Sequence, residues 1–201
     1  MWPWEHVAFA YVLYSLCSRA WRGEPPGGHA VFALSFGSLF PDLIDKPLAW
    51  TFGVFDSGYA VGHSAVALPV LAAAVLVPLA RLDRRSLGVA FLFGHVSHLV
   101  GDVIYPYLEG GRLAFSILTW PAVRPSASGA RAGFVSQFLH YFVAWWAQVR
   151  TLHPGPILLF EGTLGALVFS LWVADGAPGA AEVGSGVAAV RSALAGASLD
   201  E

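Results

Sequence analysis

Six long apolar segments, separated by short polar or glycine- and proline-rich turns, dominate the hydrophobic pattern of the chain. They run over about residues 6–20, 30–40, 64–80, 87–108, 134–149 and 156–174. Strict alternation over about ten residues, the pattern of membrane β-barrels, does not occur, so we expect helices. The second segment has only 11 residues and is too short to span a bilayer unless its helix continues past Pro41.

Composition turns this pattern into a prediction of a membrane protein. The apolar residues AVILMFWYC make up 56% of the 201 positions, whereas DEKR make up 12%. Soluble domains carry about 25% charged residues, which cover their surface. The apolar content also excludes a disordered chain. We therefore expect an all-α, polytopic membrane bundle of about five to six helices over residues 1–174, followed by a flexible, small-residue-rich tail over 175–201.

The few charges and the single cysteine set further bounds. The net charge of −2 argues against a nucleic-acid partner, and Cys17 alone allows neither an intrachain disulfide nor a cysteine-based zinc site. The first segment has no positively charged leader or cleavage pattern, so we expect it to stay attached. If successive helices cross the membrane in opposite directions and the Arg81–Arg85 cluster lies in the cytoplasm, six positive residues lie inside and four outside. The interpretation is a multi-pass protein of the cytoplasmic membrane.

Ionisable residues inside the fourth segment are the first chemical signal, because such residues are costly in a membrane. His95, His98 and Asp102 are spaced i, i+3 and i+7, which places them within about 60° of one another on a helix. The spacing of His98 and Asp102 lets one helix offer two ligands to one ion. The alternative is two packed histidines and a capping aspartate.

A second group of polar residues borders the other segments. In Pro41-Asp42-Leu43-Ile44-Asp45 we expect Pro41 in the first turn of a helix with both carboxylates on one face, where they could instead complement the helix dipole. His6 and His63 begin the first and third segments, and each alone would suit a membrane interface. Helix alternation nevertheless places all these residues on one side, which the positive-charge bias makes the extracytoplasmic one.

Together these residues predict a metal centre. The candidate ligands are His6, Asp42, Asp45, His63, His95, His98 and Asp102. Mixed imidazole and carboxylate ligation suits Zn²⁺, with Mn²⁺ or Fe²⁺ as alternatives. Seven ligands exceed what one ion needs, so we expect two or more ions, an arrangement that activates water and positions an ester or phosphoester.

The ordered series of these residues also resembles a known family. The series reads His6, Pro41-Asp42-x-x-Asp45, Gly62-His63-Ser64, Gly94-His95-x-Ser97-His98-Leu99-x-x-Asp102 and Trp120-Pro121. Over about residues 1–121 it is similar to the YdjM-like family of LexA-binding, inner-membrane-associated, metal-dependent hydrolases. That family shares the pattern of its motifs with zinc-dependent phospholipase C and P1 nuclease, which are all-helical enzymes.

The resemblance implies metal-dependent hydrolysis. The residues that match its ligand positions are His6, Asp42, His63, His98 and Asp102. Asp45 matches a ligand or a carboxylate that supports one, and His95 matches a variable position that could orient a ligand. The chain departs from the family in lacking the usual Arg and Thr shortly before His63, which removes an obvious phosphate clamp.

The leading hypothesis is an integral-membrane hydrolase that acts on an ester or phosphoester, with a lipid-derived substrate as one option. Asp42 or Asp45 would be the general base. Two alternatives remain open: a transporter of metal ions or small solutes that uses the same cluster, and a non-catalytic scaffold with a structural metal. The lipid bilayer is the expected partner, and the sequence indicates no oligomeric state.

Overall fold

The computed structural model describes residues 1–124, 133–150 and 155–197, and over these residues the chain is helical without a strand. The expected all-α class is confirmed. The described elements are α1 (Pro3–Arg22), α2 (Gly28–Trp50), α3 (Leu68–Arg81), α4 (Arg85–Leu108), the 3-10 helix η1 (Phe115–Thr119), α5 (Phe134–Arg150), α6 (Pro156–Ala174) and α7 (Ala180–Ala197).

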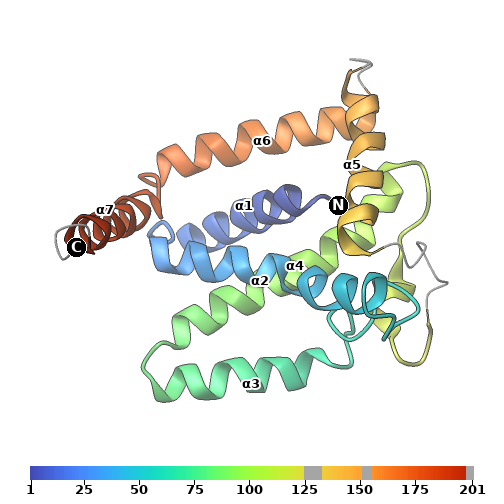
Figure 1. Cartoon of the computed structure of the whole chain (residues 1–201), viewed down its shortest axis with the longest axis horizontal. Helices are drawn as coiled ribbons and strands as arrows, with labels where there is room; N and C mark the ends of the chain where they lie inside the picture. Colours follow the sequence, from blue (N-terminus) through green and yellow to red (C-terminus); the bar gives the residue numbers. More distant parts are fainter. Residues whose placement is uncertain (125–132, 151–154, 198–201) are drawn as a thin grey trace.

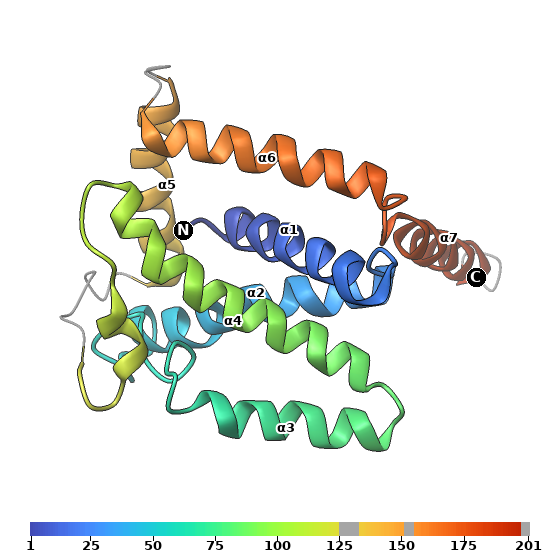
Figure 2. The same cartoon turned by 180° about the vertical axis from the view of Figure 1, so that it is seen from behind.

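Most of the helices run lengthwise through the molecule, and α5 lies across their ends (Figures 1 and 2). The lengthwise helices are α1, α2, α3, α4 and α6, whereas α5 crosses the end at which the N-terminus lies. The sequence prediction treats residues 134–149 as one more segment that runs from one end of the bundle to the other. This places Arg150 on the same side as Arg19, Arg22 and the Arg81–Arg85 cluster. Because α5 lies crosswise instead, helix alternation does not place Arg150 beside the other arginines.

Helix α4 is the one helix, among the described residues, that is long and apolar enough to cross a membrane. It has 24 residues and a mean hydropathy of 1.6. Two shorter apolar helices cover Leu68–Arg81 and Leu158–Ala174. By length and composition, the structure thus identifies one candidate span rather than the expected five to six.

Helix α2 continues past Pro41 and ends at Trp50, with Pro41 and Pro47 inside it. The prediction that Pro41 lies in the first turn of a helix is therefore wrong. Packing of α2 along α4 compensates for the hydrogen bonds that the two prolines cannot donate. Asp42 and Asp45 consequently lie within a helix, where they do not complement an N-terminal dipole.

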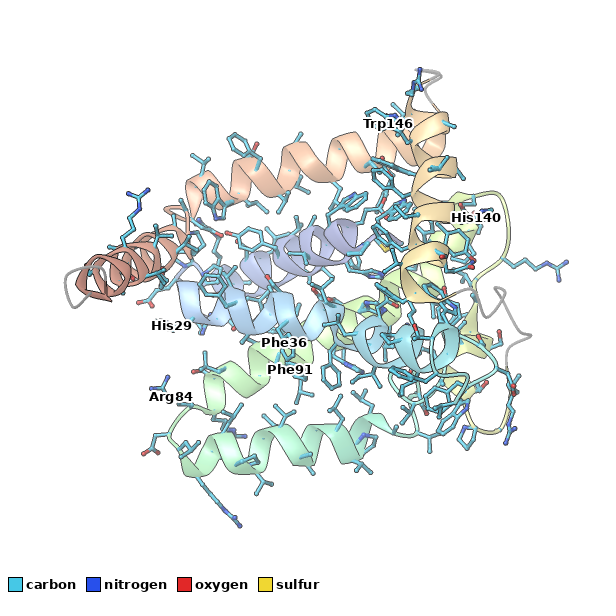
Figure 3. The ribbon with its side chains drawn as sticks, in the orientation of Figure 1. His29, Phe36, Arg84, Phe91, His140 and Trp146 are labelled. Atoms are coloured by element: carbon cyan, nitrogen blue, oxygen red, sulfur yellow. The ribbon has the colours of Figure 1, made fainter. Side chains whose placement is uncertain are left out.

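Two glycines bring the backbones of α2 and α4 into contact. A Cβ atom on Gly37 would overlap the carbonyl oxygen of Phe91, and one on Gly94 would overlap that of Leu34. Small residues at such points are what allow helices to approach closely. Beside this contact the rings of Phe36 and Phe91 lie 5.8 Å apart (Figure 3). The close approach determines the distance between the polar residues farther along both helices.

A buried carboxylate ties the end of α6 to α1. The hydroxyls of Tyr11 and Ser15 each donate a hydrogen bond of 2.6 Å to Asp175 Oδ2, and Arg19 Nε donates one of 2.8 Å to Oδ1. Burial alone would raise the pKa of Asp175, but the hydrogen bonds from Ser15, Tyr11 and Arg19 outweigh it and lower the pKa.

Replacing Asp175 with asparagine should destabilise the protein by about 2 kcal/mol, because two buried hydroxyls and Arg19 lose a charged acceptor. A lowered pKa stabilises the fold above the unfolded-state pKa of about 4, and this stabilisation is lost as the pH falls through the folded-state pKa. Thermal unfolding in detergent between pH 3 and 7 should therefore show a flatter pH dependence for Asp175→Asn. The control is Asp83→Asn at an exposed turn residue; an equal effect of both variants would contradict the prediction.

The segment after residue 174, which the sequence analysis expects to be a flexible tail, contains α7. Glu182 in α7 lies 3.8 Å from the ring of His29 at the start of α2, measured from Oε1 to Nδ1. The division of the chain at residue 174 stays a prediction.

Candidate metal centre

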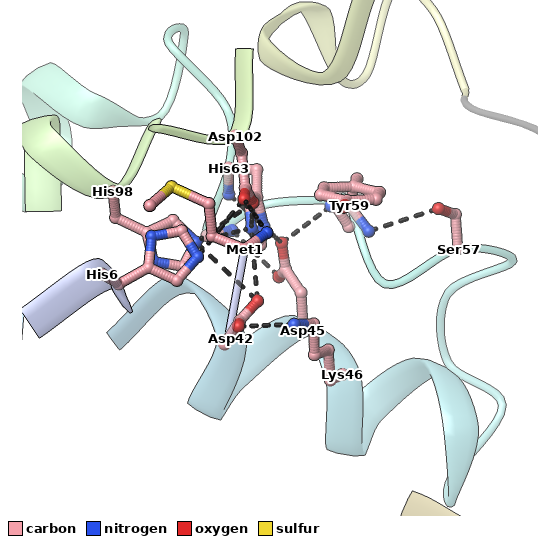
Figure 4. A network of polar contacts seen from close by, with 12 residues as sticks. Met1, His6, Asp42, Asp45, Lys46, Ser57, Tyr59, His63, His98 and Asp102 are labelled. Atoms are coloured by element: carbon pink, nitrogen blue, oxygen red, sulfur yellow. Dashed lines mark hydrogen bonds and ion pairs between the residues drawn. The ribbon is translucent and has the colours of Figure 1, made fainter. Parts of the chain in front are cut away.

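Four buried side chains from three parts of the chain converge on one point (Figure 4). Asp42 comes from α2, His63 from the loop between α2 and α3, and His98 and Asp102 from α4. One ligand atom from each residue can be chosen so that all four atoms lie within 4.8 Å of one another. The structure thus brings together four of the seven residues that the sequence analysis singled out.

The two histidines of this group present the same ring nitrogen to each other. Nδ1 of His63 lies 2.8 Å from Asp45 Oδ2, and Nδ1 of His98 lies 2.7 Å from the carbonyl oxygen of Ser38. Since a carbonyl only accepts, His98 Nδ1 carries a proton, and we assign His63 the same tautomer. The two Nε2 atoms are 3.1 Å apart, so their lone pairs repel unless a proton or a cation lies between them.

The two carboxylates complete the donor set. Asp102 Oδ2 lies 3.4 Å from Nε2 of both His63 and His98. Asp42 Oδ1 lies 3.5 Å from His63 Nε2 and has no hydrogen-bond partner among the residues that the structure describes. Two imidazole nitrogens and two carboxylate oxygens, one of them unpaired, form a set that fits a divalent cation.

Asp45 holds this arrangement in place from behind. Its fully buried carboxylate accepts hydrogen bonds from the backbone N–H groups of Ala60 (2.7 Å), Gly62 (2.9 Å) and His63 (3.2 Å) as well as from His63 Nδ1. Such a partner determines the orientation and tautomer of a ligating histidine. This geometry favours the supporting position for Asp45; its predicted roles as a ligand and as a general base stay predictions.

We expect Asp45→Asn to weaken metal binding by about 10- to 100-fold, the usual effect of losing the carboxylate behind a histidine ligand. The asparagine amide would also point a donor at backbone N–H groups that need an acceptor. Competition with a fluorescent chelator on the purified protein measures this affinity. Asp56→Asn, at an exposed position of the same loop, is the control. An unchanged affinity in Asp45→Asn would rule out the supporting role.

His6 lies beside the group of four, and His95 lies outside it. The ring of His6 stacks on that of His98 at 3.7 Å between centroids, and its Nε2 is 3.3 Å from Asp102 Oδ1. Neither nitrogen of the buried His6 ring makes a hydrogen bond within the described part of the chain. His95 lies one turn before His98, with its ring centroid 6.1 Å from that of Phe40. Ligation by either residue, and the number of ions, stay predictions.

The electrostatics of the loop residues reflect the surrounding carboxylates. Burial would lower the pKa of His63, but hydrogen bonds to Asp102, Asp42 and Asp45 outweigh it and raise the pKa to about 10. The charge of Asp102, together with burial and Asp42, raises the pKa of Tyr59 well above its ordinary value, so its phenol stays protonated. The negative potential that stabilises a cationic imidazole also attracts a metal ion.

A cavity of about 680 Å³ opens beside the group of four, Asp42, His63, His98 and Asp102, which we call the metal group. Asp42 and Asp102 line this cavity. Two polar residues of its lining, Lys46 and Tyr59, were not predicted from the sequence as part of the site. Lys46 Nζ lies 2.5 Å from Asp42 Oδ2, and the i, i+4 spacing of these two residues was the signal that could have revealed it. Nothing in the spacing around Tyr59 marks it; the loop alone brings its ring to 4.8 Å from that of His63.

The chain matches a known protein family over most of its length. The model of the YdjM inner membrane protein family matches residues 1–177. The chain belongs to this family. The YdjM resemblance inferred from the ordered motifs is thus confirmed, and the match extends well beyond the roughly 121 residues that carry those motifs. No curated protein and no solved structure matches the chain.

Proposed function

We propose that this YdjM-family chain is an integral-membrane, metal-dependent hydrolase that acts on an ester or phosphoester. The observation that carries the proposal is that the metal group is open to a cavity. Within the group, His63 and His98 are fully buried, whereas Asp42 and Asp102 line the cavity wall. A site that only stabilised the fold would gain nothing from such access.

The surface of the helices supports a multi-pass arrangement. Although α3 is almost entirely apolar, none of its fourteen residues, all of them described, is buried. On α6, Leu159, Leu167 and Phe169 are exposed. Lipid accommodates such surfaces, and water does not. We propose that the five lengthwise helices cross the membrane and that α5, with Trp145 beside Trp2 and Trp4, lies at its interface.

The residues around the cavity have distinct chemical roles in this proposal. A divalent ion, when bound by Asp42, His63, His98 and Asp102, supplies Lewis acidity and lowers the pKa of water. Of the two predicted candidates for general base, Asp42 lines the cavity, whereas Asp45 lies behind His63; Asp42 would act from its position beside the ion. Tyr59 can donate a hydrogen bond to the oxygen on which charge develops.

Zinc is the ion that we propose, with Mn²⁺ or Fe²⁺ as alternatives, because two imidazoles and two carboxylates match its preferred ligands. His6 offers the nitrogen for a second ion beside Asp102. The Arg81–Arg85 cluster lies at the opposite end of the molecule from the metal group, as the position of Arg84 in Figure 3 illustrates. With these arginines in the cytoplasm, the site faces the extracytoplasmic side.

The proposal is tested with purified protein in lipid nanodiscs, using p-nitrophenyl butyrate and bis(p-nitrophenyl) phosphate as substrates. We expect turnover of one of them, loss of turnover with a chelator, and recovery with Zn²⁺. Asp42→Asn should abolish it, and Asp56→Asn should not. Metal-loaded protein without turnover of either substrate would contradict the proposal, and metal uptake into proteoliposomes would favour a transporter instead.

A further inference from the structure

We propose that the cavity beside the metal group binds a phosphate-bearing lipid, with the phosphate at Lys46 and the acyl chain along the aromatic wall of α5. The lipid is a substrate class for the function proposed above. Cleavage of a bond in this lipid rests on that function, whereas its binding does not. The binding itself is carried by two contrasting walls of one cavity.

The polar wall contains the only lysine of the chain. Lys46 lines the cavity, with its Nζ on Asp42 Oδ2 and 5.7 Å from the centroid of the Trp50 ring. Its side chain is only 20% exposed, so packing holds the charge in place.

A second hydrogen-bond donor lies on the same wall. The indole Nε1 of Trp50 is buried and has no hydrogen-bond partner in the described residues. A Cβ atom on Gly58 would lie 3.3 Å from Lys46 Cγ and 3.5 Å from Trp50 Nε1, so both side chains pack around this glycine. All three residues line the cavity. An ammonium group and an unpaired indole N–H on one wall are donors that suit phosphate oxygens.

The charges around this wall leave Lys46 available to an anion. Asp42 and Asp102 are the carboxylates of the metal group, and a bound divalent ion balances their charge. Glu109, the other carboxylate that lines the cavity, is exposed to solvent, which screens it. The metal-loaded cavity therefore combines a divalent ion and an ammonium group on one side.

The wall that α5 forms is aromatic, and it adjoins the polar wall at Trp50, whose ring centroid lies 5.9 Å from that of Phe134. Phe134, Phe138, Tyr141 and Trp145 of α5 line it, and Trp2 lies against Phe138 at 5.8 Å between ring centroids. A free phosphate ion would leave this wall without a partner. The volume of about 680 Å³ lies within the usual range of ligand pockets, about 300–1,000 Å³. A phosphate joined to an acyl chain matches both walls at once, and α5 lies across the helix ends, where lipid headgroups would lie.

The test compares three ligands on zinc-loaded protein in maltoside micelles, with the fluorescence of the cavity tryptophans as the signal. Dihexanoyl phosphatidate has both parts, dihexanoylglycerol lacks the phosphate, and inorganic phosphate lacks the chains. We expect phosphatidate to bind about tenfold more tightly than either of the others. Equal affinities for phosphatidate and dihexanoylglycerol would overturn the inference, as would equal affinities for phosphatidate and inorganic phosphate.

Variants of each wall separate its contribution. Lys46→Met should reduce phosphatidate binding about tenfold, to the level of dihexanoylglycerol, and Lys46→Arg should restore it. Because Lys46 contacts a carboxylate of the metal group, zinc content is measured in parallel. Phe138→Ser tests the other wall without touching that group: it should weaken both lipids several-fold and leave inorganic phosphate unchanged. Phe169→Ser, on the exposed face of α6, is its control.

The outcomes separate this inference from the hydrolase proposal. Selective phosphatidate binding without turnover of any ester would keep the lipid site and contradict the hydrolase. Turnover of p-nitrophenyl butyrate together with equal binding of the three ligands would keep the hydrolase and overturn the lipid site. Unchanged phosphatidate affinity in both Lys46→Met and Phe138→Ser would show that the cavity is not where the lipid binds.

Discussion

Replacing His98 with alanine should reduce the metal content of the purified protein from stoichiometric to less than about one tenth of an ion per chain. His98 contributes one of only two imidazoles in the group of four, and its ring supports that of His6. Removing it leaves Asp42 and Asp102 buried beside each other with one cation-binding nitrogen fewer. Losing one of four ligands lowers the affinity of such a site by orders of magnitude.

Elemental analysis by mass spectrometry, on protein purified without a metal-affinity tag, measures this content. The matched control is His29→Ala, since the side chain of His29 is 74% exposed and lies at the far end of the molecule (Figure 3). If His98→Ala retains the metal content of the unaltered protein, the group of four is not the metal site. His6→Ala should cost at most one ion of a pair, because its ring lies beside the group of four.

The candidate site could be predicted from the sequence to the extent that it depends on helix alternation. The sequence places two histidines and a carboxylate on one face of residues 87–108. It places further histidines and carboxylates at the ends of neighbouring segments, and helix alternation puts all of them on one side of the bundle. The structure places Asp42, His63, His98 and Asp102 together at that end. Local spacing and the low number of charges were sufficient for this.

The features that could not be predicted depend on contacts between distant parts of the chain. Pro41 indicated the start of a helix. In the structure α2, which packs against α4, instead continues through Pro41 to Trp50. The pattern of residues 134–149 identified a helix but not its crosswise direction, which tertiary contacts determine. His95 lies outside the group of four because of how α4 is rotated about its axis relative to α2. The sequence periodicity predicts this rotation only to within tens of degrees.

Replacing Gly94 with alanine should disrupt the metal group from a distance, without changing any ligand. The added Cβ would overlap the backbone of Leu34, and a backbone atom cannot move aside as a side chain can. We therefore expect α2 and α4 to separate by roughly an ångström, which moves Asp42 away from His98 and Asp102. Overpacking of this kind costs about 1–3 kcal/mol.

The expected result is a metal affinity lowered by at least about tenfold and a thermal midpoint lowered by about 3–10 °C, from the same cost in free energy. The control is Gly165→Ala, on α6, where a Cβ would meet no described atom within 4 Å. It should leave both quantities unchanged or raise the midpoint slightly, because alanine favours a helix over glycine. Gly37→Ala, on the opposite side of the same contact, should reproduce the Gly94→Ala defect. If both variants bind metal normally, the close approach of α2 and α4 does not position the site, and the loop that carries His63 must determine its geometry.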